Sequence, residues 1–382
     1  MKFAHMGDCH LGGWRQPELN ELNREAFLQA IMKCIVEKVE FVLISGDLFD
    51  AAYPPIETLK DTFAALRKLK EVKIPVFMIA GSHDYSASGK SFLEVLDRAG
   101  LAKLVDRSEE KEGALYLLPT IYGNVALYGF SGKKSGLEVA DIERMKLHDA
   151  PGMYRILLLH TAIRDAVGSL PIPAVDEKKL PPVDYCALSH LHIEYNKDKR
   201  VYSGPLFPNN IQELEELRAG TFYIVENGIP RKQTIKLKEV ITCTATITNA
   251  FNATEEIINE LETLPLRDAI LILRVQGTLQ QGKANDINFQ KIEEQAKRKG
   301  AYMVLKSISA LYAAEYSLTI KPAESEDLEH AIIADFEKKY PSPFNEHNHV
   351  LIKTLQIEKG EEEKTAVFDE RLYTEFKKVL RL

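Results

Sequence analysis

Five of the ten histidines in the sequence follow directly on segments with the composition of buried β-strands. Imidazole nitrogen and carboxylate oxygen together form a ligand set that suits Mn, Fe or Zn. A core histidine or a turn aspartate is the commoner explanation for any one of these residues, but it is a poor explanation for the whole set. The pattern therefore predicts a metal centre whose candidate ligands are His10, His83, His160, His190 and His192, together with Asp8 and Asp47.

Asp47 has the most informative surroundings. Residues 41–45 form a short continuous apolar run, Phe-Val-Leu-Ile-Ser, which is typical of a strand buried on both faces. Gly46 allows a sharp turn, and the carboxylate of Asp47 is left at the carboxyl end of the strand. Ligands and metals bind at that end of open α/β sheets. Gly-Asp is also a common turn pair, so turn formation alone remains the alternative for this residue by itself.

The elements that must position these side chains alternate in type. Strands are expected at 2–6, 41–45 and 75–80, and helices at 19–37, 57–69 and 90–99, an order that is typical of a parallel sheet covered by helices. Residues 114–118 and 125–129 are expected to pair as antiparallel strands around Gly123-Asn124. A second sheet is completed by strands at 155–159, 184–188, 201–202, 222–225 and 233–237.

The pattern changes after about residue 240. Residues 242–248, 254–261, 269–275, 287–299 and 302–307 read β-α-β-α-β, and charged amphipathic helices are expected at 327–339, 347–357 and 361–380. The predicted fold is therefore α/β, a two-sheet sandwich flanked by helices, with a small α+β capping domain and a C-terminal helical tail. The predicted boundaries are 1–240, 241–324 and 325–382.

Bulk properties limit the alternatives. A chain of 382 residues is expected to form more than one domain. The net charge of −7 argues mildly against a passive nucleic-acid binder. The N-terminal stretch is too short and polar for a signal peptide, so none is expected. The sequence has no apolar run of membrane-spanning length, and its four cysteines have no paired spacing. These features predict a cytoplasmic protein with reduced thiols and no membrane partner.

The ordered motifs Asp8-x-His10, Gly46-Asp47, Gly81-Ser82-His83-Asp84, His160 and His190-x-His192 resemble the calcineurin-like metallophosphoesterase superfamily. Within it, the chain is similar to the SbcD-type DNA-repair nucleases, whose archaeal and eukaryotic members are called Mre-eleven. The resemblance is close over residues 1–13, 43–49, 75–84 and 188–205, and it continues in the order of the domains.

This resemblance implies two metal ions, usually manganese. Asp8, His10, Asp47 and His192 would hold the first ion, and Asp47 would bridge to a second ion that His160, His190 and Ser82 complete. His83 resembles the family histidine that contacts the scissile phosphate and assists the leaving group. Imidazole can donate a proton near neutral pH, which fits that task.

Two positions depart from the family pattern. Ser82 stands where the family has asparagine, and Asp50 stands where many members have histidine. A serine hydroxyl is a weaker ligand than a carboxamide oxygen and reaches less far. The departure at Ser82 therefore predicts weak occupancy of the second metal position.

The predicted function is a manganese-dependent DNA nuclease of double-strand-break repair, an exonuclease on duplex ends and an endonuclease on single strands. The alternatives are a weakly active DNA-end-binding scaffold and a phosphoesterase for a non-DNA substrate, since superfamily membership does not choose a substrate. The resemblance also implies a homodimer formed through residues 57–69 and 90–101, and binding of the tail to an SbcC-type (Rad-fifty) ATPase.

Overall fold

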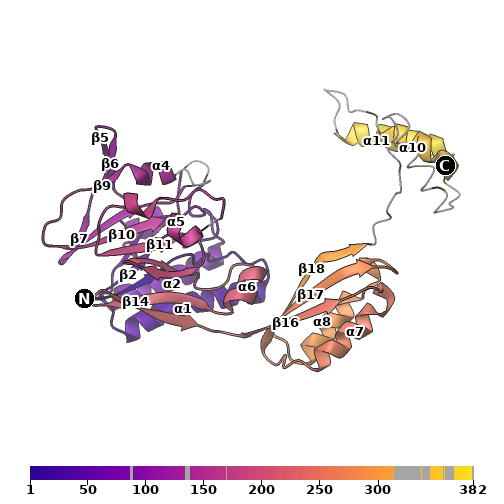
Figure 1. Cartoon of the computed structure of the whole chain (residues 1–382), viewed down its shortest axis with the longest axis horizontal. Helices are drawn as coiled ribbons and strands as arrows, with labels where there is room; N and C mark the ends of the chain where they lie inside the picture. The colour runs from indigo at the N-terminus through magenta and orange to yellow at the C-terminus, as the bar shows by residue number, and fades with distance from the viewer. Residues whose placement is uncertain are drawn as a thin grey trace. The chain divides into compact units, whose positions relative to one another are not determined.

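The computed structural model of the chain describes residues 1–86, 89–133, 138–168, 170–313, 337, 345–355, 357 and 365–380. Contacts divide the chain into two compact units, Met1–Leu311 and Tyr312–Leu382 (Figure 1). The first unit holds two six-stranded sheets and two three-stranded sheets, and the described residues of the second unit include two α-helices.

The first six-stranded sheet has the order β15-β14-β1-β2-β3-β4. Its four N-terminal strands run parallel. β14 pairs antiparallel with β1, and β15 pairs antiparallel with β14 at the edge of the sheet. The strands are β1 (Lys2–Met6), β2 (Phe41–Ile44), β3 (Val76–Met78), β4 (Lys103–Leu104), β14 (Gly220–Glu226) and β15 (Ile229–Ile235).

The second six-stranded sheet has the order β12-β13-β11-β10-β8-β7. Its four central strands are parallel and its two edge strands are antiparallel to their neighbours. The strands are β7 (Thr120–Tyr122), β8 (Val125–Phe130), β10 (Tyr154–His160), β11 (Tyr185–Ser189), β12 (Glu194–Lys197) and β13 (Arg200–Ser203).

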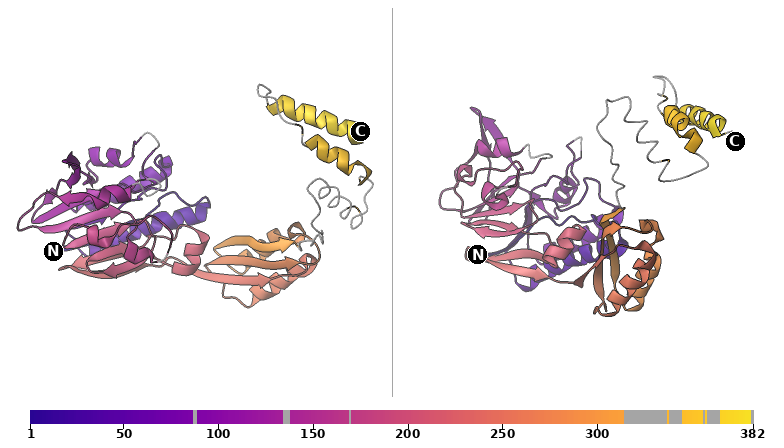
Figure 2. Two further views of the ribbon diagram at one scale, coloured as in Figure 1. Left: turned by 45° about the horizontal axis from the view of Figure 1, so that its top comes forward. Right: turned by 45° about the vertical axis from the view of Figure 1, so that its right-hand side comes forward.

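The two sheets lie face to face (Figure 1 and Figure 2). Their central strands are apolar on both sides. In β2, Phe41 and Leu43 point into the core between the sheets, while Val42 and Ile44 pack in the core that contains the helices. Alternate residues of a strand point to opposite faces, so a doubly covered strand must be apolar throughout. The helices are α1 (Pro17–Val36), α2 (Ile56–Glu71) and α3 (Leu93–Arg98), and the predicted sandwich flanked by helices is confirmed.

Two predictions about strand placement are wrong. The sequence predicts strands 222–225 and 233–237 in the second sheet, but β14 and β15 extend the first sheet, because β14 pairs with β1. β6 (Ala114–Leu117) does not pair with β8 but lies in a separate three-stranded sheet between β5 (Ser108–Lys111) and β9 (Met145–Leu147). The partner of β8 is β7, whose residues Thr120-Ile121-Tyr122 form the hairpin closed by Gly123 at φ 56°. β-branched and aromatic residues favour strand formation, so the three residues of β7 form a short strand. This strand pairs with β8 at the position that was expected for β6.

The α+β unit follows the predicted β-α-β-α-β order and has a core of its own. Leu271 and Leu273 face its helices, whereas Ile270 and Ile272 face the core of the first sheet. The domain boundaries at residues 240 and 324 stay predictions. The elements are β16 (Glu239–Thr246), α7 (Ala250–Glu262), β17 (Ala269–Leu279), α8 (Phe289–Arg298) and β18 (Met303–Ala313).

In the second unit, α10 (Asn348–Leu355) and α11 (Thr365–Leu380) contact each other. They correspond to two of the three helices expected in the tail, and the helix expected at 327–339 lies outside the described residues apart from residue 337. Among the described helices, none combines the length and the apolar composition needed to cross a bilayer.

Candidate metal centre

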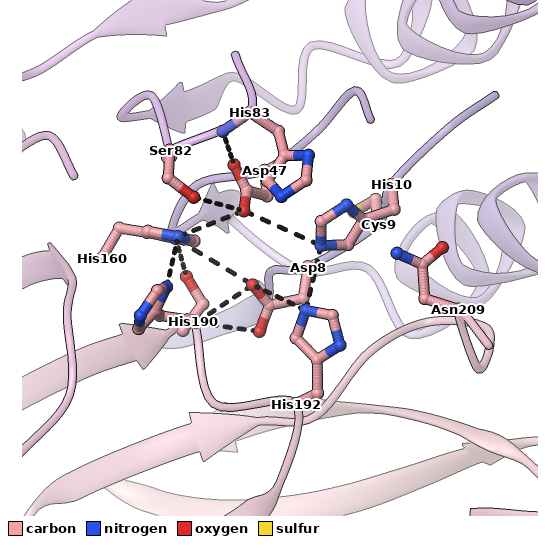
Figure 3. Close-up of polar contacts among 12 residues, drawn as sticks. Asp8, Cys9, His10, Asp47, Ser82, His83, His160, His190, His192 and Asn209 are labelled. Carbon is pink, nitrogen blue, oxygen red and sulfur yellow. Dashed lines mark hydrogen bonds and ion pairs between the residues drawn. The ribbon is translucent and has the colours of Figure 1, made fainter. Parts of the chain in front are cut away.

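Strand ends of both sheets meet at one place and bring the predicted residues together. Asp8 follows β1 and Asp47 follows β2, and the two loops are tied by hydrogen bonds from Asp8 N to Gly46 O (3.1 Å) and from His10 N to Asp47 O (3.0 Å). All eight side chains predicted for the site lie around this junction (Figure 3): Asp8, His10, Asp47, Ser82, His83, His160, His190 and His192.

The backbone of the site is held in an uncommon conformation. Left-handed φ values are rare for residues other than glycine and cost free energy, so they persist only where surrounding contacts fix them. Such residues cluster at functional sites. Five of the candidate residues have positive φ: Asp8 (47°), His10 (42°), Asp47 (48°), His190 (109°) and His192 (52°).

One group of ligand atoms gathers around Asp8. The Nε2 atoms of His10 and His192 are 2.9 Å apart, and His192 Nε2 lies 3.9 Å from Asp8 Oδ1. His10 Nε2 is also 3.7 Å from Asp47 Oδ2. Both Asp8 oxygens accept a hydrogen bond from the His190 backbone N–H, each at 3.0 Å. One ligand atom each of Asp8, His10 and His192 lies within 4.8 Å of the others.

A second group lies on the other side of Asp47. Asp47 Oδ2 is 3.2 Å from His160 Nε2, and His160 Nε2 is 3.3 Å from His190 Nδ1. Ser82 Oγ donates a hydrogen bond to the same Asp47 oxygen at 3.4 Å. Ser82 thus reaches Asp47, and this carboxylate lies between the two groups of imidazoles.

Glycines let the loops approach this closely. A Cβ on Gly81 would lie 2.2 Å from Asp47 Oδ1, and a Cβ on Gly46 would lie 2.4 Å from His160 Nδ1. Real Cβ atoms do not make such contacts, so these two positions admit only glycine without movement of a candidate ligand. The close approach explains why the Gly-Asp and Gly-Ser-His-Asp motifs carry glycine.

The floor of the site joins the two sheets. His5 is fully buried and its ring contacts Tyr185 Oη (2.9 Å) and Ser45 Oγ (3.0 Å), and burial lowers its pKa to about 3. Ser189 donates a hydrogen bond to the Ser45 carbonyl and contacts His160 Nδ1 at 3.0 Å. His5 is therefore a neutral structural histidine that no sequence motif singled out.

Two carboxylates orient the rings of His10 and His192 by contacting the ring nitrogen that faces away from the centre. Asp50 Oδ1 lies 3.1 Å from His10 Nδ1, and Glu213 Oε1 lies 3.0 Å from His192 Nδ1. A carboxylate accepts the Nδ1 proton and leaves Nε2 with its lone pair toward the centre. Glu213 was not predicted from the sequence. It lies on α6 (Ile211–Leu217), and its only signal is the helix-start spacing Asn210-x-x-Glu213.

Asp84 holds the loops that carry Asp47 and Ser82. Its carboxylate accepts hydrogen bonds from the backbone N–H groups of Leu48 (3.3 Å), Phe49 (3.0 Å) and Gly81 (2.9 Å). Burial, and then the nearby charge of Asp47, raise the pKa of Asp84 to about 7. The last residue of the Gly-Ser-His-Asp motif is therefore a structural clamp.

The charges of the site stabilise one another. Burial alone would lower the pKa of His160, but the carboxylates around it, Asp47 above all, raise it to about 9. The pKa of His192 is likewise raised to about 9, because Asp8 and Glu213 outweigh burial. Burial alone would raise the pKa of Asp47, but His160 and His10 lower it well below its usual range. Burial and the charge of His160 lower the pKa of His190.

His83 lies at the open side of the site. Its side chain is 47% exposed, whereas those of His10 and His160 are 1% exposed. Its Nδ1 is 2.9 Å from the carbonyl oxygen of Asp50, so this nitrogen carries the proton, and its backbone N–H donates to Asp47 Oδ1 at 2.8 Å. His83 is placed to meet a molecule that enters from solvent.

The donor set fits divalent cations. Two aspartates and four histidines converge, and three of the histidines have their remaining ring nitrogen held by a carboxylate or a hydroxyl. This arrangement of outer partners is typical of histidines that ligate metals. The Nε2 atoms of His10 and His192, 2.9 Å apart, are close enough either to share a proton in a hydrogen bond or to ligate the same ion.

Comparison with known proteins agrees with this chemistry. Residues 1–194 match the model of the calcineurin-like phosphoesterase family. The chain is 28% identical over 327 residues to the DNA double-strand break repair protein Mre11 of Methanosarcina acetivorans, covering 79% of this chain and 49% of that protein. It is 27% identical over 258 residues to the Mre11 protein of Archaeoglobus fulgidus, covering 62% of this chain and 57% of that protein.

A shorter segment is more similar. Over 98 residues the chain is 43% identical to the Mre11 protein of Methanococcus maripaludis, which is 24% of this chain and 26% of that protein. The matched part of this chain spans about half the length of these relatives. The family model matches half of the chain, including the strands and loops that carry the candidate ligands, so the chain belongs to the calcineurin-like phosphoesterase family.

Proposed function

We propose that the protein is a metal-dependent phosphodiesterase that hydrolyses DNA, with manganese as the metal, as an exonuclease on duplex ends and an endonuclease on single strands. The observation that carries the proposal is the convergence of two aspartates and four histidines beside an exposed histidine. Two bound divalent ions would supply an activated water and would stabilise the attacking and leaving oxygens.

The residues divide into two ligand groups around Asp47. Asp8, His10 and His192 would hold the first ion, and His160 and His190 with Ser82 would hold the second. Asp47 Oδ2 faces both groups, at 3.7 Å from His10 Nε2 and 3.2 Å from His160 Nε2, which suits a bridging carboxylate. The buried aspartates supply the negative charge, and the imidazoles supply neutral nitrogen ligands.

His83 has a different role in this proposal. Its Nδ1 proton is donated to the Asp50 carbonyl, so Nε2 is the nitrogen that faces the substrate. In the doubly protonated ring, Nε2–H would donate its proton to the leaving oxygen and leave the neutral imidazole behind. Its exposure makes it accessible to a phosphodiester, and its backbone bond to Asp47 fixes its distance from the centre. We assign it a catalytic role and no ligand role.

DNA is the proposed substrate because the relatives of this chain carry the name DNA double-strand break repair protein. The α+β unit and the helical tail follow the domain order expected for that group. A small or protein phosphoester is the alternative substrate. A DNA-end-binding scaffold of weak activity is the second candidate function, and Ser82 favours it because a hydroxyl 3.4 Å from Asp47 replaces a longer ligand.

We also propose a homodimer through α2 and α3. Leu66 and Leu96, two of the residues expected in that contact, are fully buried in the core of the protein itself. Val95 and Ile56 are exposed on the same helices, at 43% and 74%, and the half-buried residues Leu59, Phe63 and Phe92 lie beside the core. These five apolar side chains would form the contact.

One assay separates the candidate functions. Purified protein with manganese is given linear duplex DNA, single-stranded DNA or a generic aryl phosphodiester. Cleavage of both DNAs supports the nuclease. Hydrolysis of the aryl ester with intact DNA indicates a non-DNA phosphoesterase, and binding of DNA ends without hydrolysis of any substrate indicates the scaffold.

A further inference from the structure

Helix α6 lies between the proposed metal centre and the sheet of the α+β unit. One of its glutamates contacts a residue of the centre, and another contacts a residue of the sheet. Glu213 Oε1 lies 3.0 Å from Nδ1 of His192. Glu215 accepts a hydrogen bond from Arg274 Nε of β17 at 2.8 Å. Residues two apart on an α-helix are separated by about 200°, so these two side chains leave the helix on opposite faces.

The Glu213 end of this connection is fixed to the helix. Glu213 Oε2 accepts a hydrogen bond from Asn209 N at 2.8 Å, and Oε1 accepts one from Asn210 Nδ2 at 2.6 Å. Asn210 Oδ1 in turn accepts from Glu213 N at 2.9 Å and begins the helix. The carboxylate that orients His192 therefore moves only with the first turn of α6.

The Glu215 end is fixed to the sheet. A second nitrogen of the Arg274 guanidinium also donates to Glu215 Oε2, so the ion pair is bidentate on the arginine side. Glu215 and Arg274 are 27% and 33% exposed, so the pair is partly shielded from water. α6 also packs against β16, which is the parallel neighbour of β17. The helix therefore contacts two adjacent strands of the same sheet.

We propose that α6 couples the position of the three-stranded sheet to the metal affinity of His192, with Glu213 as a positioning residue and Glu215–Arg274 as the contact on the sheet. This inference rests on the proposed metal centre. A sheet that shifts away from α6 loosens the hold of Glu213 on the His192 ring and weakens metal binding. Coupling is reciprocal, so bound metal favours the sheet position seen in the structure.

The coupling can be tested without unfolding the protein. The sheet keeps its apolar contacts through Ile270, Ile272 and Leu305 when the ion pair is removed. Two control variants remove comparable surface charges, one on α6 and one on a helix of the α+β unit. Glu216→Gln removes an exposed charge of α6 that contacts only Gln212 (2.8 Å) in the part of the chain that the structure describes, and Lys291→Ala removes an ion pair of α8 with Glu255.

The experiment titrates Co²⁺ into the metal-free full chain and follows its ligand-field absorption, with free Mn²⁺ measured by electron paramagnetic resonance. Glu213→Gln is expected to weaken metal binding about 10–100-fold. Arg274→Ala is expected to weaken it between about twofold and thirtyfold, the range for a residue that acts through a coupled network. The two control variants are expected to bind like the wild type.

The charge-exchanged variant Glu215→Arg/Arg274→Glu tests whether the ion pair between these two residues is what maintains the metal affinity. Recovery of wild-type affinity supports the coupling, and failure to recover overturns the pair as the contact on the sheet. If Glu213→Gln weakens metal binding and Arg274→Ala does not, the coupling is overturned and the proposed metal centre still stands. A wild-type chain that binds neither Co²⁺ nor Mn²⁺ overturns the proposed function itself.

Discussion

His83 and Asp47 are joined by a hydrogen bond of 2.8 Å from the backbone N–H of the histidine to Oδ1 of the aspartate. The other Asp47 oxygen faces His10 and His160. One buried carboxylate thus fixes both the exposed histidine and the two groups of imidazoles. This arrangement separates a catalytic role for His83 from a ligand role for Asp47, and each can be tested by one substitution.

Asp47→Ala should remove both metal ions and nearly all hydrolysis, because Asp47 faces both ligand groups. Elemental analysis of the dialysed protein measures the metal content. Asp61→Ala is a suitable control, since Asp61 is a half-exposed carboxylate on α2 that pairs with Arg24. A variant with the metal content of the wild type would show that Asp47 is not the bridging ligand.

His83→Ser should keep metal and DNA binding while cleavage falls by about 10²–10⁴-fold, the range for loss of a general acid. Metal content, binding of labelled DNA and cleavage rate are measured on the same preparation. If bound manganese fell in proportion to the rate, His83 would be a ligand.

Ser82→Asn should shift the manganese dependence of cleavage to lower concentrations. In the proposed centre the first ion would have two carboxylates and two imidazoles, whereas the second would share Asp47 and have two neutral imidazoles and a serine that reaches only to Asp47. Supplying the longer amide should raise affinity at the second position by about 10–100-fold. Ser86→Asn, on the same loop, serves as the control, and an unchanged activation curve would contradict the argument.

Metal affinity should rise with pH up to about 9. In the metal-free protein the pKa values of His160 and His192 are raised to about 9, so both rings carry protons at pH 7 that a metal must displace. Calorimetric titration at pH 7 in two buffers of different ionisation enthalpy should report proton release. A binding heat that does not depend on the buffer would contradict the prediction.

The same shifts set the pH dependence of the metal-free fold. The pKa of His160 is about 9 in the folded protein and 6.5 in the unfolded chain, so the folded state binds its proton more tightly. This proton binding contributes its full stabilisation below pH 6.5, and the contribution is lost as the pH rises through about 9. The Tm of metal-free protein should therefore fall between pH 6.5 and 9. Saturating manganese should reduce this fall, since metal replaces the protons.

Deletion of residues 361–382 should abolish co-purification with an SbcC-type ATPase and leave the nuclease activity of the isolated protein intact. In α11 the side chains of Leu372, Phe376 and Leu380 recur on one face and are only partly buried, which suits docking of one helix on another. Co-expression with the ATPase followed by affinity purification measures the effect. Unchanged co-purification would contradict this role of the tail.

The sequence predicted well what depends on local composition. The continuous apolar run 41–45 predicted a doubly covered strand, which the structure confirms, and Asp47 at its end lies where the candidate ligands converge. Glu213 was not predicted because its contact with His192 depends on how α6 packs in the fold. No local sequence feature distinguishes it from any other glutamate in the first turn of a helix. The pairing of β8 was misassigned because three residues, 120–122, are enough to form a strand in place of β6.

The separation of the contacting residues along the chain has a consequence for folding. His10 and His192 lie 182 residues apart in sequence, and His160 belongs to a different sheet from Asp47. Contacts of such long range form late, because the intervening chain must first be ordered. The metal-binding set therefore exists only once the two sheets have closed on each other, and metal uptake by a refolding chain would mark the completion of the sandwich.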